Sequence, residues 1–545
     1  MNKQLLSLLL CLLPLFPWAA TAQDRVQLVY FRDKANSPFS LNRPSEFLGQ
    51  RAVARRSRQN IRLVERDLPV NPAYLDSIRK TGAQVLYPTR WLNGAIIRAT
   101  DAQTGAINRL SVVRNALTQR LASALSPRLG NVVDRAVPNL PAVVPENYGG
   151  ALTQIRQLGA DAMHRAGFRG EGIRIAVLDE TFPGTNRADI YGGTRILGTY
   201  NMNQGGNNVF STIADHGSRV FGMLAANRPG EAIGFAYRAD FYLFITEDNP
   251  TETRAEEAWW LAAAERADSL GVDVISTSVG YSNDFDDPSQ NYTLSNLDGR
   301  TAIITRAADF AAAAGMVVVK SAGNKGASSW QKITFPGDAD SILTVGSVDG
   351  QGRYVGTSSR GPTADGRIKP DVAAQGSGVL SISGGGSVVG TGGTSFAAPS
   401  VAGLVAGFWQ ANPTLTNLQV IDFIRRSATR FRNPNDSIGY GIPHFERAQF
   451  LITALDDAEV AREQVKLYPN PSVETMYLAL APSLTGRATE VQITDVSGRT
   501  YFQIKFVADG RIIDLRDQAL SLTPGVYLVR IRSGEVDRVF KVTKE

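Results

Sequence analysis

Between residues 152 and 455, short apolar runs alternate with longer segments rich in small residues. The apolar runs are residues 173–178, 241–245, 272–276 and 316–319, and most of them contain β-branched residues. The helix-like segments between them include residues 256–270 and 302–314, which are rich in alanine. Strands that alternate with helices in this way form a parallel sheet covered by helices. This region is therefore predicted to be an α/β domain.

The residues before this region have a different composition. Residues 24–135 contain few glycines and many arginines, and they mix strand-like runs with helix-like ones. The strand-like runs are residues 26–31 and 95–99, and the helix-like runs are residues 74–80 and 111–125. This mixture predicts a small α+β domain. Pro138, Pro141 and Pro145 then favour an extended linker over residues 136–151.

The pattern changes again near residue 466. Short runs with strand character are residues 477–480, 491–494, 526–531 and 539–542. Turn signals such as Ser497-Gly498 and Pro524-Gly525 separate these runs. Residues 466–545 are therefore predicted to form a small antiparallel β-sandwich.

Residues 1–22 have the features of an export signal. A lysine at position 3 precedes an apolar stretch over residues 5–18, and the small residues Ala20-Thr21-Ala22 follow it. No later run reaches the roughly 18 uninterrupted apolar residues that a membrane span needs. The exported protein is therefore expected to be soluble.

The cysteine and histidine content excludes several kinds of site. Cys11, the only cysteine, lies inside the signal, so a thiol nucleophile, a thiolate zinc site and an internal disulfide are excluded for the exported chain. The three histidines, His164, His216 and His444, lack the spacing of a multi-histidine metal site. No metal ligands are therefore assigned.

The formal net charge of +6 includes a local cluster of arginines. Arg51, Arg55, Arg56 and Arg58 lie close together without an intervening acid, and no aromatic residue stands among them. A run of this kind is usually the solvated face of a helix. Nucleic acid is not expected as a partner.

One motif points to a nucleophile. Residues 393–399 have the sequence GTSFAAP, and an apolar, glycine-containing run continues to Trp409. Ser395 would lie at the start of a helix, where the positive end of the helix dipole favours a developing negative charge. The alternative is that Ser395 only caps this helix, which serine commonly does.

Three further positions suit a nucleophilic serine. Asp179 follows an apolar run, at the strand end where open α/β sheets bind their ligands. His216 begins a segment with helical spacing of apolar residues, and Asn324 follows the apolar run at 316–319. Each of these residues alone has an ordinary explanation as a turn, cap or surface residue.

In chain order, Asp179, His216, Asn324 and Ser395 resemble the catalytic constellation of the subtilisin-like serine proteases. Residues 267–271, which lead to residues 278–280, are similar to the substrate-lining strand of this family. The runs SSRGP at 358–362 and KPD at 369–371 are similar to one of its surface loops. The resemblance covers essentially all of residues 152–455, and it implies a subtilisin-like parallel sheet flanked by helices.

The resemblance also implies a mechanism, which is acyl transfer to a serine. Ser395 would attack the peptide carbonyl, His216 would act as general base, and Asp179 would orient the imidazole. Asn324 would donate to the oxyanion together with the backbone N–H of Ser395. The substrate backbone is expected to contact Ser278, Val279, Gly280, Ala322 and Gly323.

Three residues depart from the usual pattern of the family. Glu180 stands where many members have a small hydroxyl residue, and Ser218 stands where threonine is frequent. Lys325 follows Asn324, and it is expected to line the first specificity pocket and to favour acidic substrate side chains. These departures concern local electrostatics and substrate preference rather than the reaction class.

The flanking segments also show resemblances. Residues 24–135, with RQNI at 58–61 and RWLNG at 90–94, resemble the pro-regions of such proteases. A pro-region assists folding and acts as an intramolecular inhibitor until self-cleavage, which is expected within residues 130–147. An unrelated surface domain is the alternative.

The tail resembles the C-terminal sorting domain of the type IX secretion pathway. This resemblance lies in LYPNP at 467–471, DVSGR at 495–499 and GVY at 525–527. It implies that the outer-membrane secretion machinery is a partner of the tail. A carbohydrate-binding or adhesive sandwich is the alternative.

Together these features predict a serine endopeptidase that is exported through the periplasm and is secreted or held at the cell surface. Protein or peptide substrates are expected, and no cofactor is expected to be required. The alternative is a catalytically inactive peptide-binding or adhesive protein on the same scaffold. Calcium sites are frequent in the family, but Asp284, Asp286 and Asp287 are interpreted as a solvated loop, so structural calcium is left open.

Overall fold

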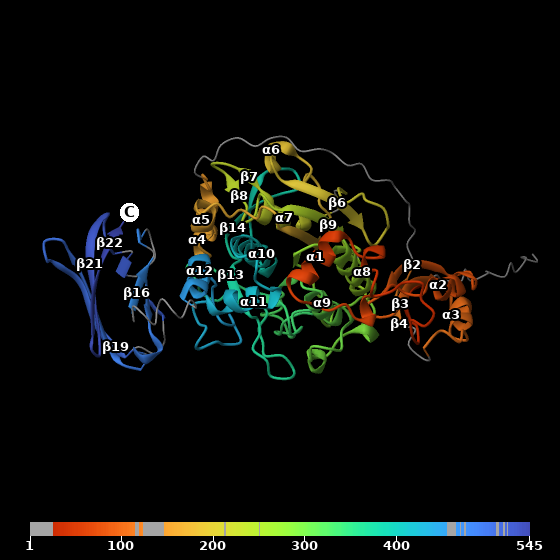
Figure 1. Ribbon diagram of the computed structural model, residues 1–545. Coiled ribbons are helices and arrows are strands. Elements are labelled where there is room, and N and C mark those ends of the chain that lie inside the picture. The colour runs from red at the N-terminus through yellow and green to blue at the C-terminus, as the bar shows by residue number, and fades with distance from the viewer. Residues whose placement is uncertain are drawn as a thin grey trace, which may run out of the picture. The chain divides into compact units, whose positions relative to one another are not determined.

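The computed structural model describes most of the chain, and Figure 1 shows its elements. The described residues are 25–114, 119–123, 146–211, 214–249, 251–454, 465–468, 470–472, 476–484, 486–507, 512–515, 518–519 and 521–544. The predicted signal, with Cys11, and most of the predicted linker lie outside them. The chain divides into two compact units, Met1–Phe445 and Glu446–Glu545. None of the described helices combines the length and apolar character that crossing a membrane requires.

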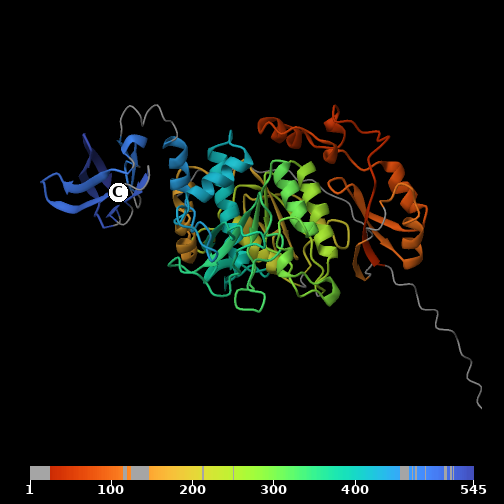
Figure 2. The same ribbon diagram turned by 90° about the horizontal axis from the view of Figure 1, so that it is seen from below.

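The first unit is built around a seven-stranded sheet in which all strands run parallel (Figures 1 and 2). The strand order is β13-β12-β11-β10-β5-β9-β6. The strands are β5 (Arg174–Asp179), β6 (Arg195–Asn201), β9 (Asp240–Ile245), β10 (Val274–Thr277), β11 (Val317–Ser321), β12 (Leu343–Val348) and β13 (Val372–Gln375). The four apolar runs predicted from the sequence correspond to β5, β9, β10 and β11.

Helices cover both faces of this sheet, which is why its central strands are apolar on both sides. Alternate strand residues, such as Ala176, Leu178 and Ile275, share one apolar cluster with α8 and α9. On the other face, α10 packs against β10, β11, β12 and α7. The bounds of these helices are α7 (His216–Ala225), α8 (Ala255–Ser269), α9 (Ile303–Ala313) and α10 (Thr394–Ala411). The α/β architecture predicted from the alternating pattern is confirmed.

Shorter elements complete this domain, which we call the central domain. Helices α4 and α5 precede β5, and the short helix α6 follows it. The bounds are α4 (Leu152–Gln157), α5 (Ala160–Arg165), α6 (Ala188–Tyr191), α11 (Asn417–Arg426), β7 (Asn227–Arg228), β8 (Ala232–Ile233), β14 (Val379–Ile382) and β15 (Val388–Thr391). Strands β7 and β8, and likewise β14 and β15, pair antiparallel.

The N-terminal domain is a four-stranded antiparallel sheet with order β2-β3-β1-β4. Its elements are β1 (Arg25–Tyr30), α1 (Gln50–Arg58), α2 (Pro72–Arg79), β2 (Gln84–Thr89), β3 (Gly94–Ala99), α3 (Asp101–Ile107) and β4 (Gln119–Ser123). The predicted α+β character is confirmed. The helix predicted over residues 111–125 is wrong where this stretch is described, because Gln119–Ser123 forms a strand that pairs with β1.

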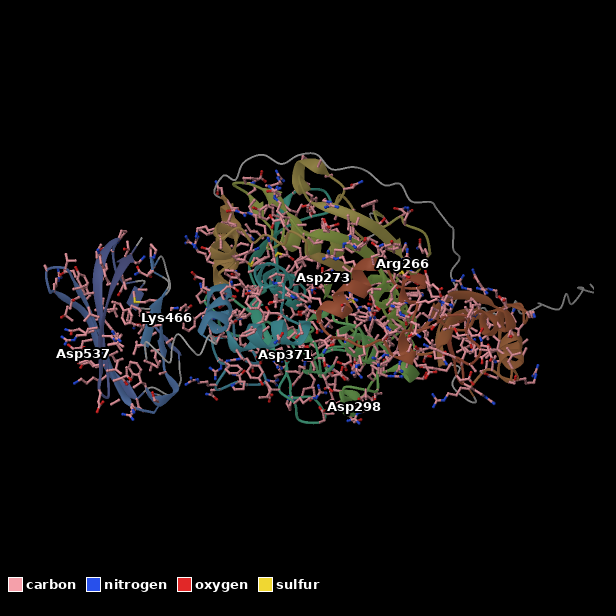
Figure 3. The ribbon with its side chains drawn as sticks, in the orientation of Figure 1. Arg266, Asp273, Asp298, Asp371, Lys466 and Asp537 are labelled. Atoms are coloured by element: carbon pink, nitrogen blue, oxygen red, sulfur yellow. The ribbon has the colours of Figure 1, made fainter. Side chains whose placement is uncertain are left out.

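Two of the four arginines clustered at residues 51–58 are buried rather than solvated. Arg55 and Arg56 are 1% and 2% exposed, and both donate to the buried carboxylate of Asp268 on α8. Arg90 also reaches Asp268, at 2.5 Å. Arg51, a residue of α1, pairs at 2.5 Å with Asp273, which Figure 3 labels. The interpretation as a solvated helix face is therefore wrong for Arg55 and Arg56, which a carboxylate far along the chain pairs with, whereas the side chains of Arg51 and Arg58 are 36% and 40% exposed beside Asp273.

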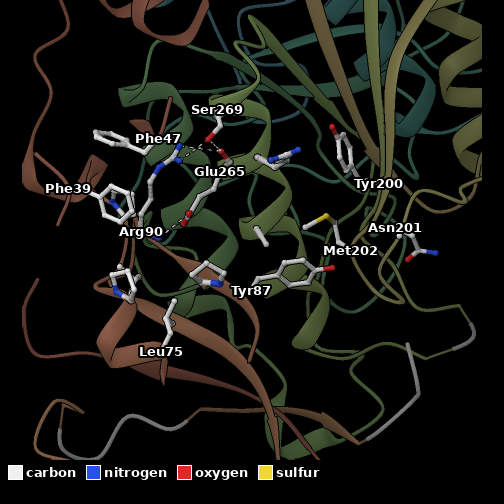
Figure 4. A pocket seen from close by; sticks show the side chains of 17 residues that line it. Phe39, Phe47, Leu75, Tyr87, Arg90, Tyr200, Asn201, Met202, Glu265 and Ser269 are labelled. Carbon is white, nitrogen blue, oxygen red and sulfur yellow. Dashed lines mark hydrogen bonds between the residues drawn. The ribbon is translucent and has the colours of Figure 1, made fainter. Parts of the chain in front are cut away.

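A second buried carboxylate fixes the loop between β2 and β3. Glu265 on α8 accepts hydrogen bonds from the hydroxyl of Thr89 at 2.6 Å and from the backbone N–H groups of Arg90 and Trp91. A cavity of about 590 Å³ lies beside these contacts (Figure 4). Its apolar lining includes Phe39, Phe47, Leu75 and Tyr87 from the N-terminal domain and Tyr200 and Met202 from the central domain. The two domains thus bury both charged and apolar groups against each other.

The second unit contains two antiparallel sheets around one apolar core. One sheet has the order β16-β17-β20 and the other has the order β19-β18-β21-β22. The bounds are α12 (Phe445–Ala454), β16 (Val465–Tyr468), β17 (Tyr477–Leu480), β18 (Ala488–Asp495), β19 (Thr500–Val507), β20 (Ile512–Asp514), β21 (Gly525–Ser533) and β22 (Val536–Lys544). The predicted antiparallel fold of the tail is confirmed.

Candidate active site

The site lies at the carboxyl edge of the parallel sheet, where β5, β10 and β11 end. Asp179 is the last residue of β5, and its side chain is fully buried. Its Oδ1 accepts a hydrogen bond from the backbone N–H of Glu180 at 2.9 Å and contacts Nδ1 of His216 at 2.6 Å. The other oxygen, Oδ2, is buried and has no hydrogen-bond partner among the described residues. The structure thus brings the predicted acid and base together.

His216 is the first residue of α7, and its side chain remains 30% exposed. Burial disfavours the imidazolium, but the charge of Asp179 and the hydrogen bond to it outweigh this effect. The charges of Glu180 and Glu247 act in the same direction, and together these groups raise the pKa of His216 to about 9. The ring also lies 5.8 Å, between centroids, from the ring of Phe396. His216 is therefore oriented on one side by a carboxylate, and it lies beside the residue that follows Ser395.

Ser395 is the second residue of α10 and is 6% exposed. Its Oγ donates to the carbonyl oxygen of Ser278 at 3.4 Å, and Oγ of Ser278 donates to the carbonyl oxygen of Ser395 at 2.8 Å. The N-cap position of α10 is Gly393, which makes no side-chain cap. The helix-cap interpretation of Ser395 is therefore wrong. In this state its hydroxyl is directed to Ser278 rather than to the imidazole.

Asn324 lies just beyond the end of β11, opposite the start of α10. Its Oδ1 accepts hydrogen bonds from the backbone N–H of Thr394 at 3.0 Å and from the Thr394 hydroxyl at 3.1 Å. These two bonds fix the amide plane and leave the Nδ2 group as the donor on the other side. Gly393 has a φ of +132°, and a Cβ there would lie 3.3 Å from Nδ2 of Asn324. Glycine at 393 therefore keeps the space beside this donor open.

Thr394 is a site residue that the sequence analysis missed. Its hydroxyl accepts from the backbone N–H of Gly323 at 3.2 Å and donates to Asn324. The available signal was its position directly before Ser395, but only the folded chain shows that it contacts the β11 side of the site.

The expected substrate-binding segments continue from neighbouring strands. β10 and β11 pair in parallel, so residues 278–280 and 322–324 leave the sheet at the same edge. Ser278 and Val279 are buried, Gly280 is exposed, Ala322 is buried and Gly323 is half-buried. Both segments therefore lie next to the start of α10, as the contacts of Ser278 and Gly323 show.

The charged residues near the site are arranged in a way that the sequence did not indicate. Lys325 pairs with Asp284 at 2.6 Å, so it already has a carboxylate partner. Burial, reinforced by the charge of Asp179, raises the pKa of Glu180. Ser218 is buried and donates to the carbonyl oxygen of Pro183 at 2.7 Å. The hydroxyl of Ser218 is therefore used in a hydrogen bond within the protein.

The acidic loop that was considered for calcium contains local hydrogen bonds. Asp287 accepts from the backbone N–H and the hydroxyl of Ser289, at 3.0 and 2.7 Å. Among the residues that the structure describes, no group of three or more His, Cys, Asp or Glu side chains is arranged to hold a metal ion.

Comparison with protein families gives three matches along the chain. The "Peptidase S8 propeptide domain, Bacteroidota" matches residues 26–130, the "Subtilase family" matches residues 170–441, and the "Secretion system C-terminal sorting domain" matches residues 466–545. The last match indicates secretion across the outer membrane.

Known proteins show the same relationship over the central domain. Subtilisin E of Bacillus subtilis (strain 168) is 30% identical over 282 residues, which cover 51% of this chain and 66% of that protein. Subtilisin of Bacillus pumilus is 30% identical over 278 residues, which cover 50% of this chain and 90% of that protein. Subtilisin DY of Bacillus licheniformis is 31% identical over 286 residues, which cover 52% of this chain and 92% of that protein. By this similarity the chain belongs to the subtilase family of serine proteases.

Proposed function

We propose that the chain is a secreted serine endopeptidase that cuts peptide bonds through an acyl-enzyme on Ser395. The observation that carries this proposal is the 2.6 Å contact between Asp179 and His216, at the sheet edge where α10 presents Ser395. An imidazole held by a buried carboxylate is the arrangement that activates a neighbouring hydroxyl.

In the reaction, rotation about χ1 turns the hydroxyl of Ser395 from the carbonyl of Ser278 to the imidazole. Neutral His216 takes the proton as Oγ attacks the substrate carbonyl, and then gives it to the leaving amine. Asp179 fixes the tautomer with the proton on Nδ1 and stabilises the imidazolium. Water then attacks the acyl-enzyme with His216 again as base, which releases the acid product and free Ser395.

The negative charge of the tetrahedral intermediate falls on the former carbonyl oxygen. We assign Nδ2 of Asn324 and the backbone N–H of Ser395 as the donors to this oxyanion. The two bonds from Thr394 to Oδ1 support the assignment, because they hold the amide plane before the substrate arrives. Loss of one such donor costs on the order of 3 kcal/mol of transition-state stabilisation.

The substrate is proposed to lie as an extended strand beside Ser278, Val279 and Gly280. Ala322 and Gly323 would form the other side of its binding site. Main-chain pairing with an exposed strand edge supplies affinity that does not depend on sequence, and side chains then select the substrate. Unfolded or loop segments of proteins fit this mode of binding.

The N-terminal domain is proposed to act as an intramolecular inhibitor that is removed by self-cleavage within residues 130–147. Its buried contacts with Glu265 and Asp268 support a stable association with the central domain. The C-terminal unit would engage the outer-membrane secretion machinery.

Covalent labelling of the secreted protein by a fluorophosphonate tests the proposed activity, because only an activated serine reacts. The label should appear on Ser395 and should be absent in Ser395→Ala. His216→Ala should lose the label as well, although it keeps the serine. Absence of labelling, together with retained binding of peptides, would support the inactive peptide-binding or adhesive alternative instead.

A further inference from the structure

Lys320 is a fully buried lysine that the proposed reaction does not use. It lies on β11, and its Nζ donates to the carbonyl oxygen of Ser321, to Oγ of Ser321 at 3.2 Å and to Oγ1 of Thr334 at 3.3 Å. All of these acceptors are neutral. Among the described residues, no carboxylate forms an ion pair with this Nζ. A lysine buried in this way is unusual, because buried charges are normally paired.

The surroundings of Lys320 do not favour its charged form. Burial lowers the pKa of Lys320 to about 7, and the more distant carboxylates of Glu247 and Asp338 offset this only in part. An anion that approached Nζ would favour the ammonium form and would gain a charge-assisted hydrogen bond.

The position of Lys320 links it to the substrate. The backbone N–H of Thr334 donates to the carbonyl of Ala322 at 3.0 Å, and Phe335 and Tyr281 exchange backbone hydrogen bonds at 3.0 and 3.2 Å. Residues 334–335 therefore contact Ala322 in one proposed substrate-binding segment and Tyr281, which directly follows the other. Oγ1 of Thr334 and Nζ of Lys320 lie at this connection.

Two glycines separate these groups from the substrate side. A Cβ at Gly280 would lie 2.7 Å from Nζ of Lys320 and 2.7 Å from Oγ1 of Thr334. A Cβ at Gly323 would also lie 2.7 Å from Oγ1 of Thr334. Gly280 is exposed, and the space that a side chain at this position would occupy adjoins the ammonium.

We propose that Nζ of Lys320 and Oγ1 of Thr334 receive the carboxylate of the substrate side chain that enters between residues 278–280 and 322–324. The enzyme then prefers glutamate or aspartate on the acyl side of the scissile bond. The flexible stem of lysine lets Nζ exchange the carbonyl of Ser321 for the entering carboxylate. This inference rests on the proposed protease function. It assigns to Lys320 the role expected for Lys325, which already pairs with Asp284.

The test compares peptides that differ only in the residue on the acyl side of the bond, namely glutamate, its neutral isostere glutamine, and leucine. For the processed full chain we expect kcat/KM to be at least about tenfold higher for glutamate than for glutamine, as one net charge-assisted hydrogen bond of 1.5–3 kcal/mol implies. The ratio is measured at one pH, so the protonation of His216 cancels.

Lys320→Met should bring the ratio of glutamate to glutamine close to one, with leucine cleavage retained. Removal of a buried unpaired lysine is compatible with folding, and fluorophosphonate labelling of Ser395 checks that the site is intact. Thr334→Val, which keeps the lysine, should lower the ratio of kcat/KM for glutamate to that for glutamine severalfold. This variant replaces Lys320→Met as the test if Lys320→Met does not fold.

Other results overturn the assignment. A labelled enzyme that cuts the glutamine or leucine peptide as fast as the glutamate peptide contradicts it while leaving the protease function intact. Loss of the preference in Lys325→Met, with retention in Lys320→Met, assigns the role to Lys325 instead. Absence of both labelling and cleavage overturns the proposed function, and this inference with it.

Discussion

Thr394 holds the side-chain oxygen of Asn324 with two donors, its backbone N–H at 3.0 Å and its hydroxyl at 3.1 Å. The hydroxyl can be removed without touching any group that reacts. We predict that Thr394→Val lowers kcat about tenfold with little change in KM, because Nδ2 is then less well positioned for the transition state. Asn324→Ala, which removes the proposed donor itself, should lower kcat by about 10²–10³.

The matched control is Thr394→Ser, which keeps the hydroxyl and should retain most of kcat. Steady-state kinetics on one peptide substrate give kcat and KM for the wild type and for the Thr394→Val, Thr394→Ser and Asn324→Ala variants. If Thr394→Val raised KM and left kcat unchanged, Thr394 would act in substrate binding rather than in positioning Asn324.

Glu180 places a second carboxylate next to the acid that orients His216. Because the general base must be neutral, the pKa of about 9 of His216 predicts that kcat/KM rises with pH and levels off only above about pH 9. In Glu180→Gln one negative charge that favours the imidazolium is removed. The pKa of His216 should therefore fall, and the rise in kcat/KM should shift to lower pH.

A pH profile of kcat/KM on an uncharged peptide checks this prediction. Glu231→Gln, which alters an exposed carboxylate paired with Arg228, is the control and should leave the profile in place. A Glu180→Gln profile that overlays the wild-type profile would show that Glu180 carries no charge felt by His216.

Much of the central domain could be predicted from the sequence because its strands are buried on both faces. A parallel strand that is buried on both faces is a continuous apolar run in the sequence. The sequence therefore predicts the bounds of β5, β9, β10 and β11 to within about two residues. The same pattern located Asp179 at a strand end, the GTSFAAP motif indicated Ser395, and the order of the motifs along the chain then suggested His216. These assignments depend on local pattern and chain order, which the sequence contains.

The errors have a common physical origin in partners distant along the chain. Gln119–Ser123 was predicted as helix, but it forms a strand because β1 offers it an edge to pair with. Arg55 and Arg56 were assigned to a solvated face, but Asp268 makes their burial possible. The pairing of Lys325 with Asp284, and the position of Lys320 Nζ next to the space where a side chain at Gly280 would lie, likewise depend on residues distant along the chain. No local pattern contains these contacts.

Asp268 is the focus of the contact between the propeptide domain and the central domain. The carboxylate of Asp268 forms ion pairs with Arg55, Arg56 and Arg90. Burial alone would raise the pKa of Asp268, but these three arginines hold it well below its usual range. Asp268→Asn would remove the carboxylate that Arg55 and Arg90 contact and would leave Arg56 with Asp67 as its remaining carboxylate partner. Removal of one partner from a buried ionic network costs about 3–5 kcal/mol. We predict a loss of that size in the free energy of unfolding of the uncut chain.

Urea unfolding measures this effect in a Ser395→Ala background, in which self-cleavage is blocked. Asp76→Asn is the control, since Asp76 is 61% exposed in its pair with Arg79 and should change stability by less than about 1 kcal/mol. Equal losses in the two variants would mean that the arginine network contributes nothing specific to the contact.

The preference proposed for Lys320 also predicts where the chain cuts itself. The stretch expected to contain the processing site, residues 130–147, has only two acidic residues, Asp134 and Glu146. Cleavage on the carboxyl side of these residues leaves an N-terminus at Arg135 or at Asn147. N-terminal sequencing of the secreted protein should find one of these two ends.

Asp134→Asn combined with Glu146→Gln should slow the appearance of the processed form at least about tenfold, by the same charge-assisted interaction. Lys320→Met should abolish this difference between the acidic and the amide sequences, because the receptor that distinguishes them is gone. An N-terminus after an apolar residue in this stretch would contradict the acidic preference, whereas a chain that stays uncut although its Ser395 reacts with a fluorophosphonate would show that it does not process itself.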